Sequence, residues 1–405
     1  MHLVEVLDKK EEINFLETAR VIYKYDDNWV CPLNDDIRGI FDRRRNEKFL
    51  NGDARRWVLK DDNDRPIGRI AAFVDNAYAA SYDQPTGGIG FFECIEDQEA
   101  AQILFDTARQ WLAQKGMEAM DGPINFGAND AYWGLLVDGF TPHAFRTPYH
   151  RHYYRRLFEG YGFKSYYHQY AFHLDINNHF PQRFWKIAEW ISKKPEYEVK
   201  YFRFKDQDRF INDFVEIYNS TWPSFKEDFV PIDAEMVRKL LQDVRPVLVE
   251  EFNLFGYHKG RPIAFYVNLP DLNQIIRDFK GRLHAFNLMR FFYRVKFTKR
   301  INRLRSVIYG IAPKYRRSGI DAAIFWHLRE ALKKHPHYQQ IELTWVGDFN
   351  PGMLNMWHRF NASRAKEYIT YRYLFDRTRL FERYPIPKNN SRPRGKGERI
   401  NRRLQ

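Results

Sequence analysis

An internal repeat constrains the fold of this chain more than any other feature of its sequence. Residues 55–75 and 246–271 each contain two strand-like runs around a polar turn, which is the pattern of a β-hairpin. The second run of each pair opens on the same triplet, Arg65-Pro66-Ile67 and Arg261-Pro262-Ile263, about 196 positions apart. This self-similarity predicts that one α+β unit is used twice.

Each hairpin is followed by the same succession of a strand, a helix and a second strand. The first of these helices places Ala101, Leu104, Ala108 and Trp111 on one face, and Gly116 can end it. The predicted elements are 87–94, 98–116 and 117–125 in the first half, and 308–312, an amphipathic helix after Gly319 and 338–346 in the second half.

The length of the chain favours two domains, because 405 residues are too many for one ordinary core. We expect an α+β protein with domains at 1–175 and 176–378, followed by a basic tail at 379–405. The tail lacks periodicity, and we predict that it is disordered. Two unrelated α/β domains are the alternative to a duplicated unit.

Composition narrows the class of partner. A net charge of +13 favours a phosphate-bearing cofactor, an anionic membrane face or nucleic acid, without choosing among them. The two cysteines, Cys31 and Cys94, make no disulfide framework and lack metal-site spacing, so we expect a reducing cytoplasm and no metal. No apolar run is long enough to cross a membrane, and the first residues lack the apolar stretch of a signal peptide.

A basic turn between the strand at 308–312 and the following helix is the strongest candidate binding site. The first amide N–H groups of a helix are unpaired and carry partial positive charge, so they bind phosphate well. Gly319 allows the backbone to approach a ligand closely, and Arg316 and Arg317 add charge-assisted hydrogen bonds. An ordinary polar turn is the competing interpretation.

Residues 313–320, which read Pro-x-Tyr-Arg-x-x-Gly-Ile, resemble the acyl-CoA loop of the GCN5-related N-acetyltransferases (GNAT), whose pattern is Arg/Gln-x-x-Gly-x-Gly/Ala between the fourth strand and the third helix. The resemblance implies two tandem GNAT-like domains, each a mixed, mainly antiparallel sheet flanked by helices. It implies acyl-CoA, or an acyl-carrier-protein thioester, as co-substrate. The residues that it assigns to the co-substrate are Ile311, Ala312, Arg316, Arg317, Ser318, Gly319, Ile320 and Ala322.

One residue departs from this pattern. Asp321 stands at the last Gly/Ala position, where a carboxylate would face the pyrophosphate. Either the chain register shifts there, or Asp321 caps the helix by pointing away from the ligand. The equivalent turn of the first half carries Glu93, Glu96 and Asp97, which would repel a pyrophosphate. We therefore expect the first half to be a degenerate partner that helps to build the acceptor cleft.

Longer motifs resemble a bacterial family of tandem GNAT-like proteins that includes, or lies near, the bacterial ceramide synthases. These motifs are "IYKYDDNWVCPL", "IGRIAAFVD", "GPINFGANDAYWGLLVDGF" and "YYRRLFEGYGF". The resemblance implies transfer of a long acyl chain to a lipid amine such as a sphingoid base. Tyr149-His150-Arg151-His152 replaces the Asn-Pro-Pro of relatives, so the role of that loop stays open.

The expected general acid is missing from the sequence. In the superfamily a tyrosine usually follows the asparagine that ends the fifth strand by seven residues, and counting from Asn350 that position is Trp357. Phe158 stands at the comparable place in the first half. By placement, Tyr309, Asp271 and Asn350 are the candidate catalytic residues.

A basic, aromatic segment at 284–305 follows the second hairpin. It can lie in a membrane interface, or it can be an amphipathic segment that faces the core with solvated cations. We favour peripheral contact of a cytoplasmic protein with the anionic inner membrane face over nucleic acid, because no nucleic-acid motif is present. Two other functions stay open, namely a Fem-type aminoacyl-tRNA-dependent transferase and a non-catalytic acyl-CoA-binding protein.

Overall fold

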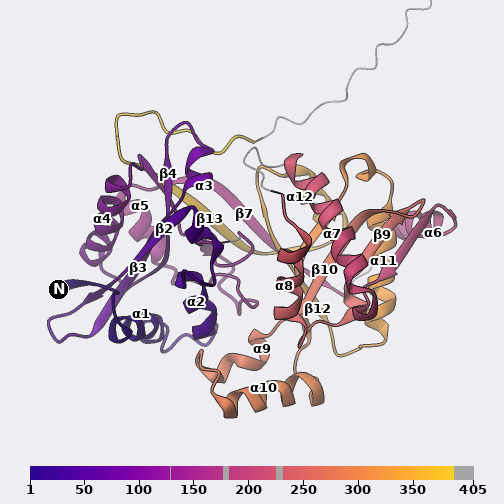
Figure 1. Ribbon diagram of the computed structural model, residues 1–405, viewed down its shortest axis with the longest axis horizontal. Helices are drawn as coiled ribbons and strands as arrows, with labels where there is room; N and C mark the ends of the chain where they lie inside the picture. Colours follow the sequence, from indigo (N-terminus) through magenta and orange to yellow (C-terminus); the bar gives the residue numbers. More distant parts are fainter. Residues whose placement is uncertain (128, 177–181, 225–230, 387–405) are drawn as a thin grey trace, which may run out of the picture.

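The computed structural model describes residues 1–127, 129–176, 182–224 and 231–386 (Figure 1). Thirteen strands form one sheet in the order β1-β2-β3-β4-β5-β13-β7-β12-β11-β10-β9-β8, with β6 paired to β13 beside this path. The strands are β1 (His2–Glu5), β2 (Gly52–Lys60), β3 (Pro66–Asp75), β4 (Thr86–Cys94), β5 (Ala119–Gly122), β6 (Leu135–Asp138), β7 (Lys164–Asp175), β8 (Tyr197–Tyr201), β9 (Leu254–His258), β10 (Arg261–Pro270), β11 (Arg303–Ile311), β12 (Gln340–Gly347) and β13 (Ser363–Leu374). The helices are α1 (Lys9–Ile22), α2 (Asn34–Phe41), α3 (Asn76–Ala80), α4 (Gln98–Gln114), α5 (Tyr154–Tyr161), α6 (Gln182–Ser192), α7 (Gln207–Thr221), α8 (Ala234–Val244), α9 (Asn273–Ile276), α10 (Ala285–Phe297), α11 (Ile320–Lys333) and α12 (Pro351–Arg359).

The isoleucine of the shared Arg-Pro-Ile triplet has the same position and the same backbone hydrogen bond in both halves. Ile67 on β3 and Ile263 on β10 each sit at an irregularity of the hairpin register. The carbonyl oxygen of Ile67 accepts the N–H of Ile95 at 3.0 Å, and that of Ile263 accepts the N–H of Ala312 at 2.8 Å. Ile95 and Ala312 both follow the fourth strand of their unit directly. The predicted α+β repeat is therefore confirmed down to individual hydrogen bonds.

The two halves exchange their last strands. β7 belongs to the first half of the chain but pairs with β12 of the second, whereas β13 from the end of the second half pairs with β5 of the first. β7 and β13 also pair with each other, which joins the two mixed sheets into one. All pairs are antiparallel except β4–β5 and β11–β12, which a helix connects in each half. The predicted domain limits at residues 175 and 378 stay a prediction, because strands from before and after residue 175 belong to one continuous sheet.

The exchange also reaches the two main hydrophobic cores. Ile369 and Tyr371 of β13 pack in the first-half core with residues of α4 and α5. Phe172 and Leu174 of β7 pack in the second-half core, which lies between the sheet and helices α6, α11 and α12. Each core is therefore completed by side chains from the other half of the sequence.

No helix within the described residues is both long and apolar enough to cross a membrane. Of the predicted tail, residues 387–405 lie outside the described residues, and residues 379–386 form no helix or strand. The segment at 284–305 consists of α10, a short connection and the first three residues of β11.

Candidate functional site

A gap between two parallel strands defines the candidate site. β11 and β12 pair only over Arg303–Ser306 and Gln340–Leu343. Beyond these residues β11 continues with β10 after an extra residue, Val307, and β12 continues with β7 after an irregularity at residues 344–345. The two strands therefore separate toward their carboxyl ends, where the basic turn lies.

In the first half the corresponding gap is closed by the main chain. β4 and β5 pair over Thr86–Gly88 and Ala119–Asp121. The next residues of the chain stay close to β4, because the N–H of Ile124 donates to the carbonyl of Ile89 at 2.8 Å. A Cβ atom added to Gly90 would stand only 1.9 Å from the carbonyl oxygen of Ile124. Backbone therefore occupies the place where an open cleft would be needed.

The basic turn has the geometry of a helix-terminus anion site. A single turn of 3-10 helix (Pro313–Tyr315) leads to Arg316 and Arg317, which are exposed. Gly319 then begins α11 with a left-handed φ of 88° and supplies no side-chain cap to the helix. A Cβ atom on Gly319 would lie 2.7 Å from Cγ2 of Ile187 in α6, so glycine is required here for both conformation and packing.

Asp321 lies in the first turn of α11, and the two sequence interpretations of its position stay predictions. Burial raises the pKa of its carboxyl group, and hydrogen bonds from the N–H groups of Ala322 and Asp321 itself oppose that shift. In the first half, the Asp97 carboxylate caps α4 through the N–H groups of Glu99 and Ala100.

Tyr309 lies in a buried aromatic cluster beneath α11 and α12. Its ring centroid is 5.4 Å from that of Tyr266 and 6.4 Å from that of Trp357. Within the described residues, the hydroxyl of Tyr309 and the indole N–H of Trp357 have no hydrogen-bond partner. Burial, helped by the charge of Asp321, raises the pKa of Tyr309 well above its usual value. Tyr309 is therefore a protonated, unsatisfied donor beside the position where the superfamily usually has its tyrosine.

The other two predicted catalytic residues have well-defined structural partners. The Asn350 side chain accepts the N–H of Met353 at 3.2 Å and caps α12. Asp271 accepts the N–H groups of Phe145 and Asn273 and two hydrogen bonds from Arg303. Because Asp271 lies beside Arg303 at the start of β11, it is about 25 Å along the strand from the basic turn. The structure thus brings Tyr309 close to the turn and keeps Asp271 away from it.

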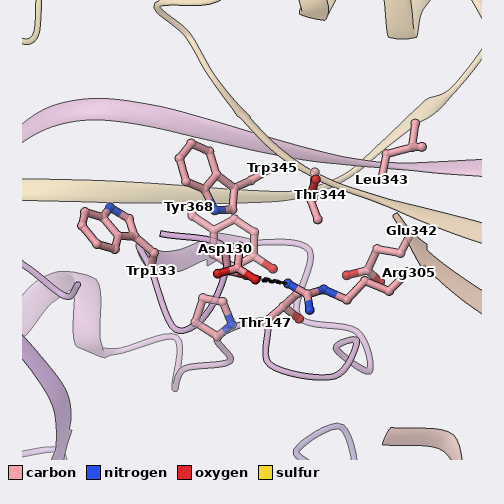
Figure 2. Close-up of a pocket in the computed structure, with 11 residues that line it drawn as sticks. Asp130, Trp133, Thr147, Arg305, Glu342, Leu343, Thr344, Trp345 and Tyr368 are labelled. Atoms are coloured by element: carbon pink, nitrogen blue, oxygen red, sulfur yellow. Dashed lines mark hydrogen bonds and ion pairs between the residues drawn. The ribbon is translucent and has the colours of Figure 1, made fainter. Parts of the chain in front are cut away.

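A narrow cavity of about 10 Å³ lies beside the point where β11 and β12 separate (Figure 2). Both halves of the chain contribute to its wall, which consists of Asp130, Trp133, Thr147, Pro148, Ala171, Arg305, Glu342, Leu343, Thr344, Trp345 and Tyr368. Three buried polar atoms from this wall have no hydrogen-bond partner in the described part of the chain, namely Nε of Arg305, Oε1 of Glu342 and the hydroxyl of Tyr368. Two donors and one acceptor without partners thus belong to residues that line a cavity with a volume close to that of one water molecule.

The charge of Glu342 is maintained by three neighbours. Its other carboxylate oxygen lies 3.5 Å from Nζ of Lys366, 3.2 Å from Nε2 of His173 and 3.4 Å from a guanidinium nitrogen of Arg303. Burial alone would raise the pKa of Glu342, but Lys366, His173 and Arg303 outweigh it and lower the pKa. Glu342 is therefore ionised at neutral pH despite complete burial.

Sequence reasoning did not identify the residues of this cavity. Arg305, Glu342 and Tyr368 stand on three different strands, and Asp130 stands in a first-half loop, so no local spacing connects them. The sequence does contain a partial signal for these residues. Glu342 stands inside the otherwise apolar strand pattern of "YQQIELTWV", and a charged residue in such a strand indicates a buried site with charged or polar partners.

Comparisons with known proteins agree with this geometry. No protein-family model matches the chain. Protein YghO of Escherichia coli is 26% identical over 376 residues, which cover 90% of this chain and 93% of the relative. A bacterial ceramide synthase of Caulobacter vibrioides is 25% identical over 383 residues, which cover 92% of this chain and 97% of the relative.

Two solved structures share the fold. A tandem GNAT protein from the clavulanic acid biosynthesis pathway has a TM-score of 0.56 at 10% identity and covers 92% of this chain and 98% of its own. The GCN5-related glucosamine N-acetyltransferase region of a fungal β-N-acetylglucosaminidase has a TM-score of 0.57 at 11% identity, covering 92% of this chain and 38% of its own. This chain thus shares the fold of a tandem GNAT protein and is a distant sequence relative of the two bacterial proteins.

Proposed function

We propose that this protein transfers an acyl group from a thioester to an amine, with the thioester held by the second half and the amine entering between the halves. The observation that carries the proposal is the separation of β11 from β12. The basic turn stands at the open end of this gap, and the cavity with three unsatisfied polar atoms stands at its closed end. GNAT-fold neighbours named as N-acetyltransferases support the reaction class.

The donor is proposed to be acyl-CoA or an acyl-carrier-protein thioester. Arg316 and Arg317, with the N–H groups of the turn, face its phosphates. The pantetheine arm runs along β11 from Ala312 and Ile311 toward Val307, where the extra residue turns the strand. The remaining contacts are those predicted for Ser318, Gly319, Ile320 and Ala322.

The chemistry is assigned to the unsatisfied groups. The amine nitrogen attacks the thioester carbonyl carbon while Oε1 of Glu342 accepts a hydrogen bond from it, and the proton that the nitrogen loses passes to water, because the lowered pKa of Glu342 makes its carboxylate a weak base. The Arg305 Nε–H and the Tyr368 hydroxyl donate to the oxygen that becomes negative. When the carbon–sulfur bond breaks, Tyr309 gives its proton to the thiolate from the side of the sheet covered by α11 and α12.

The finer assignment is a long-chain acyl donor and a sphingoid base acceptor. It rests on the relative named bacterial ceramide synthase and on the sequence motifs described above. A primary amine head fits a cavity close to the size of one water molecule, whereas the rest of a lipid acceptor must extend outside it.

The test is turnover by the purified full-length protein with palmitoyl-CoA or acetyl-CoA and sphinganine. We expect an N-acyl product by mass spectrometry, with an equal amount of free thiol. Glu342→Gln keeps the shape but removes the charge and should lower kcat by about 10²-fold or more while palmitoyl-CoA still binds. Binding of palmitoyl-CoA without turnover on any amine would contradict the proposal and indicate an acyl-CoA-binding protein.

The cofactor turn has its own test. Arg316→Ala should raise the KM for acyl-CoA at least tenfold, roughly the effect of one lost charge-assisted hydrogen bond. Arg155→Ala is the matched control, because Arg155 is an exposed arginine of the first half in an i,i+4 pair with Glu159. An unchanged KM in the Arg316 variant would exclude the turn from the donor site.

A further inference from the structure

We propose that the exposed face of α10, together with the basic residues at its two ends, binds the headgroup region of an anionic lipid bilayer. α10 lies at the edge of the molecule, on the side away from α12 (Figure 1). The inference concerns a surface separate from the transfer site and does not depend on the proposed reaction.

α10 has two apolar faces: Phe291 and Val295 pack against the second-half core, and a second set of apolar side chains faces outward. Seven of the eighteen exposed large hydrophobic side chains in the described residues lie between residues 283 and 297, so the exposure is concentrated here rather than scattered. Phe297 is 74% exposed, Met289 65%, Tyr293 61% and Phe286 60%. On a helix of 3.6 residues per turn, these four side chains form one stripe, and Phe292 stands beside it.

Polar contacts on the inner side keep the helix in this orientation. The Asn287 side chain is buried and donates to the carbonyl of Arg282 at 2.8 Å. Arg290 and Arg294 both form ion pairs with Asp278, which precedes the helix, and both stack over the Phe279 ring. Turning the apolar stripe inward would bury an aromatic face at the cost of breaking these ion pairs. An ordinary surface helix also packs one apolar face inward, but it presents a polar face to water.

Charge complementarity selects an anionic lipid surface as the occupant. Lys280 precedes the helix, Lys296 is exposed on it, and Lys299 and Arg300 follow it, all with exposed side chains, whereas the exposed Arg282 pairs with Glu17 at 3.0 Å. The acidic Asp278 is neutralised by its two arginines, and their hydrogen bonds lower its pKa to about 2. Aromatic and aliphatic side chains between terminal cations are typical of a helix that lies in the headgroup layer, because lysine and arginine stems extend along the apolar surface toward phosphates.

Part of the basic segment expected from the sequence does not belong to this surface. Arg303 and Arg305 are buried in β11, because their guanidinium groups form ion pairs with Asp271 and Asp130. The surface therefore ends at Arg300.

The experiment is co-sedimentation of the full-length protein with vesicles of phosphatidylcholine alone and of phosphatidylcholine with 30% phosphatidylglycerol. We expect binding to the anionic vesicles that weakens with added salt. The double variant M289Q/F297Q should lower the partition coefficient at least tenfold without changing the melting temperature. The matched control is M236Q/L240Q on α8, where Met236 and Leu240 are 45% and 55% exposed, and it should bind as the unmodified protein does.

Three outcomes would overturn the proposal. The unmodified protein could fail to bind anionic vesicles, or both double variants could bind equally well. The third is a concentration-dependent dimer, seen by light scattering without vesicle binding and lost in M289Q/F297Q, which would identify a second copy of the chain as the occupant. Because no acyl substrate is present, each outcome is independent of whether the enzyme turns over.

Discussion

At the scale of single residues, the proposed acid stands at a different position from the tyrosine that the GNAT resemblance implies. The side chain at the usual tyrosine position is Trp357, which is 3% exposed and cannot donate a proton to a thiolate. The hydroxyl of Tyr309 lies in the same aromatic cluster but comes from β11. A phenol in this position can serve the same leaving group from a different element.

Removal of the Tyr309 hydroxyl tests this exchange of roles. Tyr309→Phe should lower kcat by about 10²-fold and leave KM for acyl-CoA within a factor of about three, because the hydroxyl acts only when the carbon–sulfur bond breaks. Thiol release under saturating substrates measures the effect.

The neighbouring Tyr266→Phe provides the control for that measurement. Its hydroxyl is also buried without a hydrogen-bond partner in the described residues, so the two substitutions have similar effects on packing. Equal losses of kcat in the two variants would show that packing, and not proton transfer, explains the result.

Two buried histidines make the protein sensitive to acid. The N–H of Val30 donates to Nε2 of His143 at 3.0 Å, and the N–H of Leu136 donates to Nδ1 of His150 at 3.0 Å. Burial lowers the pKa of His143 to about 4 and that of His150 to about 3. Both rings are therefore neutral acceptors in the folded protein, which assigns His150 a structural place in the loop whose role the sequence left open.

The direction of the pH effect follows from these values. Between about pH 6.5 and 4 the unfolded chain binds protons that the folded chain does not, so the free energy of unfolding falls as the pH falls through this range. We expect a loss of about 1.4 kcal/mol per pH unit for each histidine. Urea unfolding at pH 7.5, 6.0 and 5.0 measures it, and His143→Asn should flatten the dependence. A free energy of unfolding that is constant over this range would contradict the assignment.

At the scale of elements, the contact between the basic turn and α6 determines the shape of the candidate donor site. Gly319 has a φ of 88°, and a Cβ atom added to it would meet the side chain of Ile187 in α6. Gly260 in the β9–β10 turn has a φ of 74°, and a Cβ atom added there would have no atom within 4 Å. Both glycines are in the left-handed region, so an alanine at either one carries a conformational cost.

Comparison of the two alanine variants separates conformation from packing. Gly260→Ala should lower the free energy of unfolding by about 1 kcal/mol. Gly319→Ala should lower it by about 1–3 kcal/mol more, because the added methyl meets Ile187, and it should also weaken acyl-CoA binding. Equal free energies of unfolding of the two variants would mean that α6 can shift away from the turn and relieve the contact with Ile187 without cost. Urea unfolding and titration calorimetry supply the two measurements.

At the scale of the whole molecule, strand exchange makes the two halves interdependent. Without β13, the edge of β5 in the first half would be unpaired, and without β7 the same would hold for β12. An unpaired central strand exposes hydrogen-bonding groups and apolar side chains, which favours aggregation.

Fragments of the chain should therefore fold only together. We expect residues 1–178 and residues 179–405 to be insoluble or unfolded when produced separately and to form a stable complex when co-expressed. Circular dichroism and size-exclusion chromatography of each sample measure this. A sharp unfolding transition in either isolated fragment would show that its sheet is complete without the other half.

The repeat, the hairpins and the basic turn were determined by the sequence alone, because they depend on local patterns. Alternating apolar residues, the Arg-Pro-Ile triplets and a glycine before an amphipathic helix each predict a short stretch of backbone, and the structure has all of them. The position of Trp357 could also be counted from Asn350, since both belong to one helix and its cap.

The strand exchange, the cavity and the orientation of α10 were decided only by the tertiary structure. Which edge a strand joins depends on free energies summed over both cores. The local sequence of β7 or β13 therefore does not show which strand it will pair with. Glu342, Arg305 and Tyr368 meet because β13, β7, β12 and β11 follow one another in the sheet, with β7 supplied by the other half of the chain. The pattern of α10 has apolar residues on more than one face, and the tertiary contacts of Asn287, Phe291 and Val295 and the ion pairs of Asp278 decide which of them point outward.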